Sequence, residues 1–165
     1  AKVAFEENLT NVAFLRTGIS FLDYFFGTNE VDEIWITFPD PQMKKVNKRL
    51  TSTTFLAIYR SILSSQGIIH LKTDSLFLFT YTSELIKLNN LPVLAQTDDL
   101  YASEIRNFEL SIKTYYERQW LARGITIKYI AFKLPKETIL EEPNIEIPFD
   151  EYRSFGRNQR AKLNI

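Results

Sequence analysis

The chain alternates between two kinds of hydrophobic pattern, and this alternation limits its fold more than any other feature. Short runs of β-branched and aromatic residues, typical of strands, are separated by longer stretches with apolar residues at helical spacing. Strands are predicted over residues 12–16, 33–38, 67–72, 92–96 and 125–134. Helices are predicted over residues 1–8, 19–26, 51–63, 75–89 and 108–123. This order indicates an α/β domain with a mostly parallel sheet, and the closeness of the last two strands suggests an antiparallel C-terminal strand.

The composition excludes several classes of function. Twenty basic and twenty acidic residues balance, so affinity for a polyanion must come from local clusters of charge. Cysteine is absent, which excludes a disulfide framework, a thiol nucleophile and a cysteine-ligated metal centre. The single histidine, His70, leaves no multi-histidine metal site, and we expect no metal cofactor. Since His70 alternates with apolar residues inside a predicted strand, we interpret it as structural.

Length and hydropathy predict one domain over residues 1–165, because a domain typically takes roughly 100–200 residues. No apolar run approaches the roughly 18 residues of a membrane span, and no signal peptide is recognisable. We therefore expect a soluble cytoplasmic protein without a membrane partner, either a monomer or a homodimer. Residues 135–165 are predicted to form an extended tail, first acidic and then basic, with the cations Arg153, Arg157, Arg160 and Lys162.

Asp40 is the first candidate site residue. It follows the predicted strand 33–38, and ligands of open α/β sheets bind beyond the carboxyl ends of the strands. Pro39 and Pro41 restrict the backbone on both sides, and such rigidity suits a group that must be positioned at a reaction centre. The alternative is an aspartate that only caps a turn.

A basic run follows directly. Four cations fall within six residues without an intervening acid: Lys44, Lys45, Lys48 and Arg49. A basic loop at the ligand-binding edge of a sheet suits a phosphate backbone, although it could also be a solvated surface loop.

Two further acids are less specific. Asp74 follows the predicted strand 67–72 and could simply cap the next helix. Glu117 ends the segment Thr114–Tyr115–Tyr116–Glu117, where it could be a surface acid beside core tyrosines.

Taken together and in order, three motifs resemble those of the bacterial tRNA (guanine-N7-)-methyltransferase family, which uses S-adenosylmethionine. The strongest is FPDPQMKKVNKRLT at residues 38–51, and the others are GIIHLKTD at residues 67–74 and TYYE at residues 114–117. The similar stretch covers about residues 3–134. The resemblance implies a Rossmann-like class I methyltransferase fold and transfer of a methyl group to N7 of a guanine in tRNA.

The same resemblance assigns roles to individual residues. Asp40 would be the catalytic aspartate at the junction of cofactor and guanine, and Thr17 and Gly18 would also contact the cofactor. The substrate would be bound by Lys44, Asp74, Thr114, Tyr115, Tyr116 and Glu117. The tRNA backbone would be bound by Lys45, Lys48 and Arg49.

The family's glycine-rich cofactor motif would lie ahead of Ala1, so the resemblance predicts an N-terminally incomplete domain, a shortened form of the enzyme. The strand expected at residues 12–16 would then lack its central neighbour, or would move to cover the exposed strand.

Two alternatives remain beside this interpretation. One is a Rossmann-like methyltransferase with another substrate. The other is a non-catalytic RNA-binding or assembly module that has lost its cofactor half. Binding of S-adenosylmethionine separates the enzyme from the module, and the methylated product separates the two enzymes.

Overall fold

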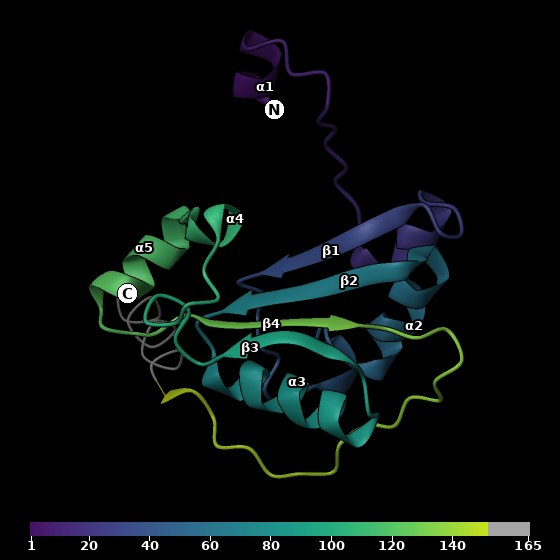
Figure 1. Cartoon of the computed structure of the whole chain (residues 1–165), viewed down its shortest axis with the longest axis vertical. Helices are drawn as coiled ribbons and strands as arrows, with labels where there is room; N and C mark the ends of the chain where they lie inside the picture. The colour runs from purple at the N-terminus through teal and green to yellow at the C-terminus, as the bar shows by residue number, and fades with distance from the viewer. Residues whose placement is uncertain (152–165) are drawn as a thin grey trace, which may run out of the picture.

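The structure contains one four-stranded sheet in which three strands run in the same direction. A computed structural model of the chain describes residues 1–151. The strands β1 (Val31–Thr37), β2 (Leu63–Thr73), β3 (Val93–Thr97) and β4 (Lys128–Lys133) lie in the order β1-β2-β4-β3. β1 and β2 pair in parallel, whereas β4 is antiparallel to both β2 and β3 (Figure 1). The predicted α/β class, with an antiparallel last strand, is confirmed.

Two helices, α2 (Thr53–Ile62) and α3 (Leu76–Leu88), cover one face of this sheet. Alternate residues of β2 and β4 point to this face, because successive side chains of a strand face opposite sides. The buried core here contains Leu56, Tyr59, Ile69, Leu71, Leu78, Leu85, Ile130 and Phe132. Because α2 follows β1 and α3 follows β2, both helices begin at the edge where these parallel strands end.

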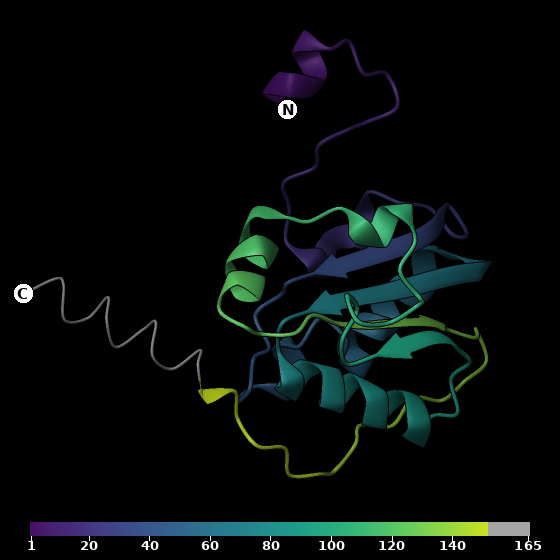
Figure 2. The same ribbon diagram turned by 60° about the vertical axis from the view of Figure 1, so that its left-hand side comes forward.

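A smaller cluster lies on the other face and is formed by Leu100, Leu110, Ile127, Tyr129 and Ala131. The short helices α4 (Phe108–Ser111) and α5 (Tyr115–Ala122) lie near the ends of β1 and β2 in both views (Figures 1 and 2). They bring the TYYE segment to the carboxyl edge of the sheet.

The N-terminal segment differs in part from its prediction. The helix α1 (Lys2–Glu6) forms as expected, and it stands away from the sheet in both views. The strand predicted at residues 12–16 is wrong: these residues are extended but pair with no described strand. Their apolar side chains are exposed, with Phe14 at 65%, so the run has the composition of a strand without a partner.

Three other elements differ from their predictions in helix type or in boundaries. Residues 19–26 form a 3-10 helix, η1 (Ile19–Tyr24), rather than an α-helix. β2 begins at Leu63, directly after α2, whereas the strand was predicted to begin at residue 67. The helix predicted over 108–123 is two helices, because Thr114 starts α5 as an N-cap. A second 3-10 helix, η2 (Val46–Lys48), lies in the basic run.

Beyond β4, residues 134–150 form neither helix nor strand. The basic residues predicted at 153, 157, 160 and 162 lie outside the described residues.

Candidate functional site

The parallel pairing of β1 and β2 places Asp40 and Asp74 at the same edge of the sheet. Thr37 and Lys72 are paired at the end of the ladder, and the Phe38 amide extends it by donating to the Lys72 carbonyl at 2.8 Å. Asp40 lies three residues beyond Thr37, and Asp74 lies two residues beyond Lys72. This edge therefore carries both predicted aspartates, on neighbouring loops.

The turn that holds Asp40 has two left-handed residues. Phe38 and Gln42 have φ of 51° and 47°, a conformation that costs about 1–2 kcal/mol for residues with a side chain. Asp40 stabilises the turn, because its Oδ1 accepts a hydrogen bond from the Gln42 amide at 2.9 Å. The aspartate nevertheless remains exposed. It caps a turn, as the structural alternative predicted, and it also presents a carboxylate at the sheet edge.

The basic run divides into exposed lysines and one buried arginine. Lys44, Lys45 and Lys48 are exposed, and none forms an ion pair within the described residues. Arg49 is only 7% exposed, so its guanidinium does not present an open surface to a phosphate backbone, in contrast to the expectation.

Arg49 instead binds backbone carbonyls of the loop that precedes it. Its guanidinium donates to the carbonyls of Gln42 and Met43 at 3.3 and 3.0 Å. It also lies over the rings of Phe77 and Tyr81, at 4.8 and 4.4 Å from their centroids. Arg49 therefore fixes the shape of the loop that displays the three lysines.

Asp74 is fully buried at the junction of β2 and α3. Its carbonyl accepts a hydrogen bond from the Lys128 ammonium at 3.2 Å, and the next residue, Ser75, is the N-cap of α3. Burial lowers the pKa of Lys128, against the opposing effect of the carboxylates of Asp74, Asp150, Asp98 and Asp99. A second cation thus lies buried near the candidate site.

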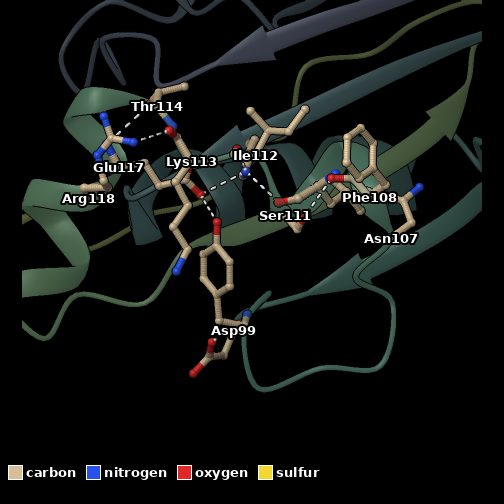
Figure 3. Close-up of polar contacts among 12 residues, drawn as sticks. Asp99, Asn107, Phe108, Ser111, Ile112, Lys113, Thr114, Glu117 and Arg118 are labelled. Carbon is tan, nitrogen blue, oxygen red and sulfur yellow. Dashed lines mark hydrogen bonds and ion pairs between the residues drawn. The ribbon is translucent and has the colours of Figure 1, made fainter.

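The TYYE segment is organised by a capping box. The Thr114 hydroxyl accepts from the Glu117 amide at 3.2 Å, and the Glu117 carboxylate accepts from the Thr114 amide at 3.1 Å (Figure 3). Tyr115 and Tyr116 are exposed by 65% and 64%, with their rings edge to face at 5.5 Å. The two tyrosines are therefore surface residues, not core residues as the structural alternative had them.

Glu117 is fully buried and pairs with a residue that sequence reasoning did not select. Its Oε1 lies 2.9 Å from Lys72 Nζ and accepts a hydrogen bond from the Tyr101 hydroxyl at 2.6 Å. Lys72 also donates to the carbonyls of Leu110 and Ile112, at 2.9 and 3.2 Å. The available sequence signal was a lysine at the end of an apolar strand, where a buried charge requires a partner.

One residue of this edge, Asp40, suits the cofactor implied by the resemblance. The exposed carboxylate of Asp40 is opposite in charge to a sulfonium. Thr17 and Gly18 precede η1, and within residues 1–151 no hydrogen bond or ion pair joins either of them to Asp40. The roles of Asp40, Thr17 and Gly18 as cofactor contacts therefore stay predictions.

Within residues 1–151, no group of three or more His, Cys, Asp or Glu side chains could hold a metal ion. No helix of the described part of the chain has the length and apolar character needed to cross a membrane.

Comparison with known proteins gave matches over nearly the whole chain. The family model described as "Putative methyltransferase" matches residues 1–130. A protein of Bacteroides thetaiotaomicron is 56% identical over 163 residues, which cover 99% of this chain and 65% of that protein. A protein of Porphyromonas gingivalis is 57% identical over 164 residues, covering 98% of this chain and 67% of that protein.

A more distant relative, from Christiangramia forsetii, is 49% identical over 137 residues, which cover 81% of this chain and 61% of that protein. All three relatives bear the name tRNA (guanine-N(7)-)-methyltransferase. The chain spans about 65% of the length of the first of them.

Proposed function

The chain belongs to this methyltransferase family, and we propose that it forms the tRNA-facing part of an enzyme that methylates N7 of a guanine in tRNA. The observation that carries the proposal is the pairing, within one loop, of a rigid exposed carboxylate with three exposed lysines that form no ion pair within residues 1–151. The relatives' shared name supports the same substrate. Because tRNA is the substrate, we place the reaction in the cytoplasm.

Methylation of guanine N7 requires alignment rather than a strong base. N7 is an unprotonated acceptor in the major groove, and its lone pair is available for attack. S-adenosylmethionine, when bound, supplies an electrophilic methyl group on a sulfonium. Transfer of that methyl group would form the N7–carbon bond while the carbon–sulfur bond broke, would leave the electron pair on sulfur and would place the positive charge on the base. The protein has to hold the two groups in line and stabilise that charge.

Asp40 has the charge and the rigidity for this role. We assign it orientation of the guanine, by accepting from its N1–H and N2–H₂ donors, and electrostatic stabilisation of the transferred positive charge. The hydrogen bond from the Gln42 amide fixes Oδ1, so the carboxylate is held in place before the substrate arrives. Thr17 and Gly18 stay proposed cofactor contacts.

The other predicted residues divide between direct contact and support. We propose that Lys44 contacts the guanosine, that Lys45 and Lys48 contact the tRNA phosphates, and that Tyr115 and Tyr116 stack on an unpaired base. Asp74, Thr114 and Glu117 complete the guanine pocket. Since Asp74 and Glu117 are fully buried, their role is to support the residues that line the pocket.

The test is methylation of tRNA followed by strand cleavage specific for 7-methylguanine. It compares this chain and a form with the full length of its relatives. In the active form, Asp40→Asn should keep the turn and the fold, because an amide oxygen also accepts from the Gln42 amide. We expect a loss of turnover of about 10- to 1000-fold, as for loss of one electrostatic contact to a transition state.

The matched control is Asp32→Asn, which removes an exposed aspartate of β1 and should leave turnover unchanged. If Asp40→Asn retained wild-type turnover, the assignment of Asp40 would be wrong. If cleavage occurred at no guanine, or at a base other than guanine, the proposed substrate would be wrong.

A second candidate is an RNA-binding module that does not use the cofactor. It is favoured by the exposed side chains of Lys44, Lys45 and Lys48, which suit binding of a phosphate backbone without any cofactor. Calorimetric titration of S-adenosylmethionine decides between the two, because the module would bind tRNA and give no heat with the cofactor.

A further inference from the structure

The segment of residues 136–150, here called the C-terminal strap, lies beyond the residues matched by the methyltransferase family model, which end at 130. It leaves the end of β4 and runs along α3 on the side away from the sheet, as both views show (Figures 1 and 2). The strap has no helix or strand. Its side chains and backbone nevertheless make specific contacts with the helices above it.

At one end, the strap binds the C-termini of α2 and α3. The Lys136 ammonium donates to the carbonyls of Arg60 and Leu63, at 2.5 and 2.6 Å. The Asn89 side chain, at the end of α3, exchanges two hydrogen bonds with the backbone of Glu141, at 2.8 and 2.7 Å. The Lys136 cation thus satisfies carbonyl groups that the end of α2 leaves without partners, and the Asn89 side chain joins the end of α3 to the strap backbone.

From Glu142 onward, the strap binds the N-termini of the same helices with two carboxylates. Glu142 accepts from the amide and the hydroxyl of Thr53, both at 2.8 Å, at the first residue of α2. Asp150 accepts from the Phe77 amide at 3.0 Å and from the Ser75 hydroxyl, at the start of α3. All four ends of α2 and α3 are therefore held by one segment, with anions at both N-termini.

The N-terminal contacts reach the candidate site directly. Asp150 is 6% exposed, and its backbone amide donates to the Met43 sulfur at 3.3 Å. Met43 directly precedes Lys44, the first cation of the basic loop of residues 44–49. The neighbouring Phe149 packs edge to face on Phe77 at 5.7 Å, and the Arg49 guanidinium lies over the ring of Phe77. Asp150 thus touches both the loop that displays the lysines and the helix start that follows Asp74.

We propose that the C-terminal strap is a clamp that sets the position of the basic loop relative to Asp74, and that Asp150 is its positioning residue. The contacts at Lys136 and Asn89 stabilise the helices at their far ends, whereas the contact at Asp150 holds the edge that faces the RNA. The RNA part of this inference rests on the proposed function. The clamp itself does not, because it concerns contacts within the chain.

The test compares Asp150→Ala with Lys136→Met. Both remove strap contacts to a helix end, but only the first lies at the candidate site. Hydrogen exchange followed by mass spectrometry on peptides covering residues 40–50 and 74–80 reports the clamp. Loss of a helix cap should increase exchange there by about tenfold in Asp150→Ala, with little change in Lys136→Met.

Affinity for tRNA is measured on the same proteins. At matched thermal stability we expect Asp150→Ala to weaken binding several-fold and Lys136→Met to leave it unchanged. Asp150→Asn should show the hydrogen exchange and the tRNA affinity of the wild-type chain, because an amide oxygen also accepts from the Phe77 amide. Glu146→Gln, an exposed acid of the strap with no hydrogen bond in the described structure, controls for lost charge.

Equal effects of Asp150→Ala and Lys136→Met on both readouts would overturn the positioning role and leave only a stabilising one. Unchanged exchange in residues 40–50 of Asp150→Ala would overturn the clamp. If the wild-type chain bound no tRNA, the proposed function would fail, while the exchange measurement would still decide the clamp.

Discussion

Replacement of Lys72 by methionine should destabilise the fold strongly, because it leaves the fully buried Glu117 carboxylate without its counter-charge. Removing one partner of a buried ion pair typically costs about 3–5 kcal/mol. Glu117 would keep hydrogen bonds from Tyr101 and the Thr114 amide, which favours the lower part of this range. The carbonyls of Leu110 and Ile112 would lose their shared donor, which acts in the opposite direction.

For a domain of about 150 residues, 1 kcal/mol corresponds to about 2–4 °C in Tm, so Lys72→Met should lower Tm by about 6–20 °C. The measurement is a double-mutant cycle of Lys72→Met and Glu117→Gln, followed by thermal and urea unfolding. The double variant should recover much of the loss, because no charge then remains buried without a partner.

Lys87→Met, at an exposed lysine in the last turn of α3, is the matched control and should change stability by less than about 0.5 kcal/mol. A Lys72→Met loss below about 1 kcal/mol would refute the reasoning. So would a double variant as unstable as the sum of the two single variants, because the two residues would then not interact.

Two other variants test separate parts of the site. Arg49→Met should destabilise the chain by about 1–3 kcal/mol in urea unfolding, because it removes buried hydrogen bonds from a charged group. Lys48→Met should leave stability nearly unchanged and reduce the slope of log binding constant against log salt concentration for tRNA by about 1. The reverse assignment of the two effects would show that Arg49 is the phosphate contact. Burial lowers the pKa of His70, so the unfolded chain takes up a proton more readily than the folded one, and the unfolding free energy should fall as the pH drops from about 7 toward 5. His70→Gln should flatten that pH dependence in urea unfolding, and an unchanged slope would contradict it, since His70 is the only histidine.

The strand and helix pattern could be predicted from the sequence wherever the partner of each element lies within the described chain. The strands around residues 33–38 and 67–72 pair with each other, and their short apolar runs, rich in β-branched and aromatic residues at 33–38, indicated both. Residues 12–16 have a similar composition but form no strand, because a strand needs a neighbour and composition does not supply one. The break at Thr114 could have been recognised from the spacing of Thr114 and Glu117, which is that of a capping box.

The roles of the candidate site residues were harder to predict from the sequence, because the role of a charged residue depends on whether it is buried. The run from Lys44 to Arg49 looks uniform in sequence, yet Arg49 is buried and the lysines are exposed. Lys72 and Asp150 were not selected, because their partners, Glu117 and the start of α3, are distant in sequence. Contacts over 45 or 73 residues leave no local pattern from which to infer them.

The position of β4 has a consequence for synthesis of the protein. It is translated after the other three strands of the described sheet, yet it fills the gap between β2 and β3, and β3 pairs with no other described strand. A nascent chain that ends before Lys128 therefore carries two open backbone edges that face each other. Such edges readily accept a foreign strand, so the growing polypeptide is exposed to misassociation until β4 emerges.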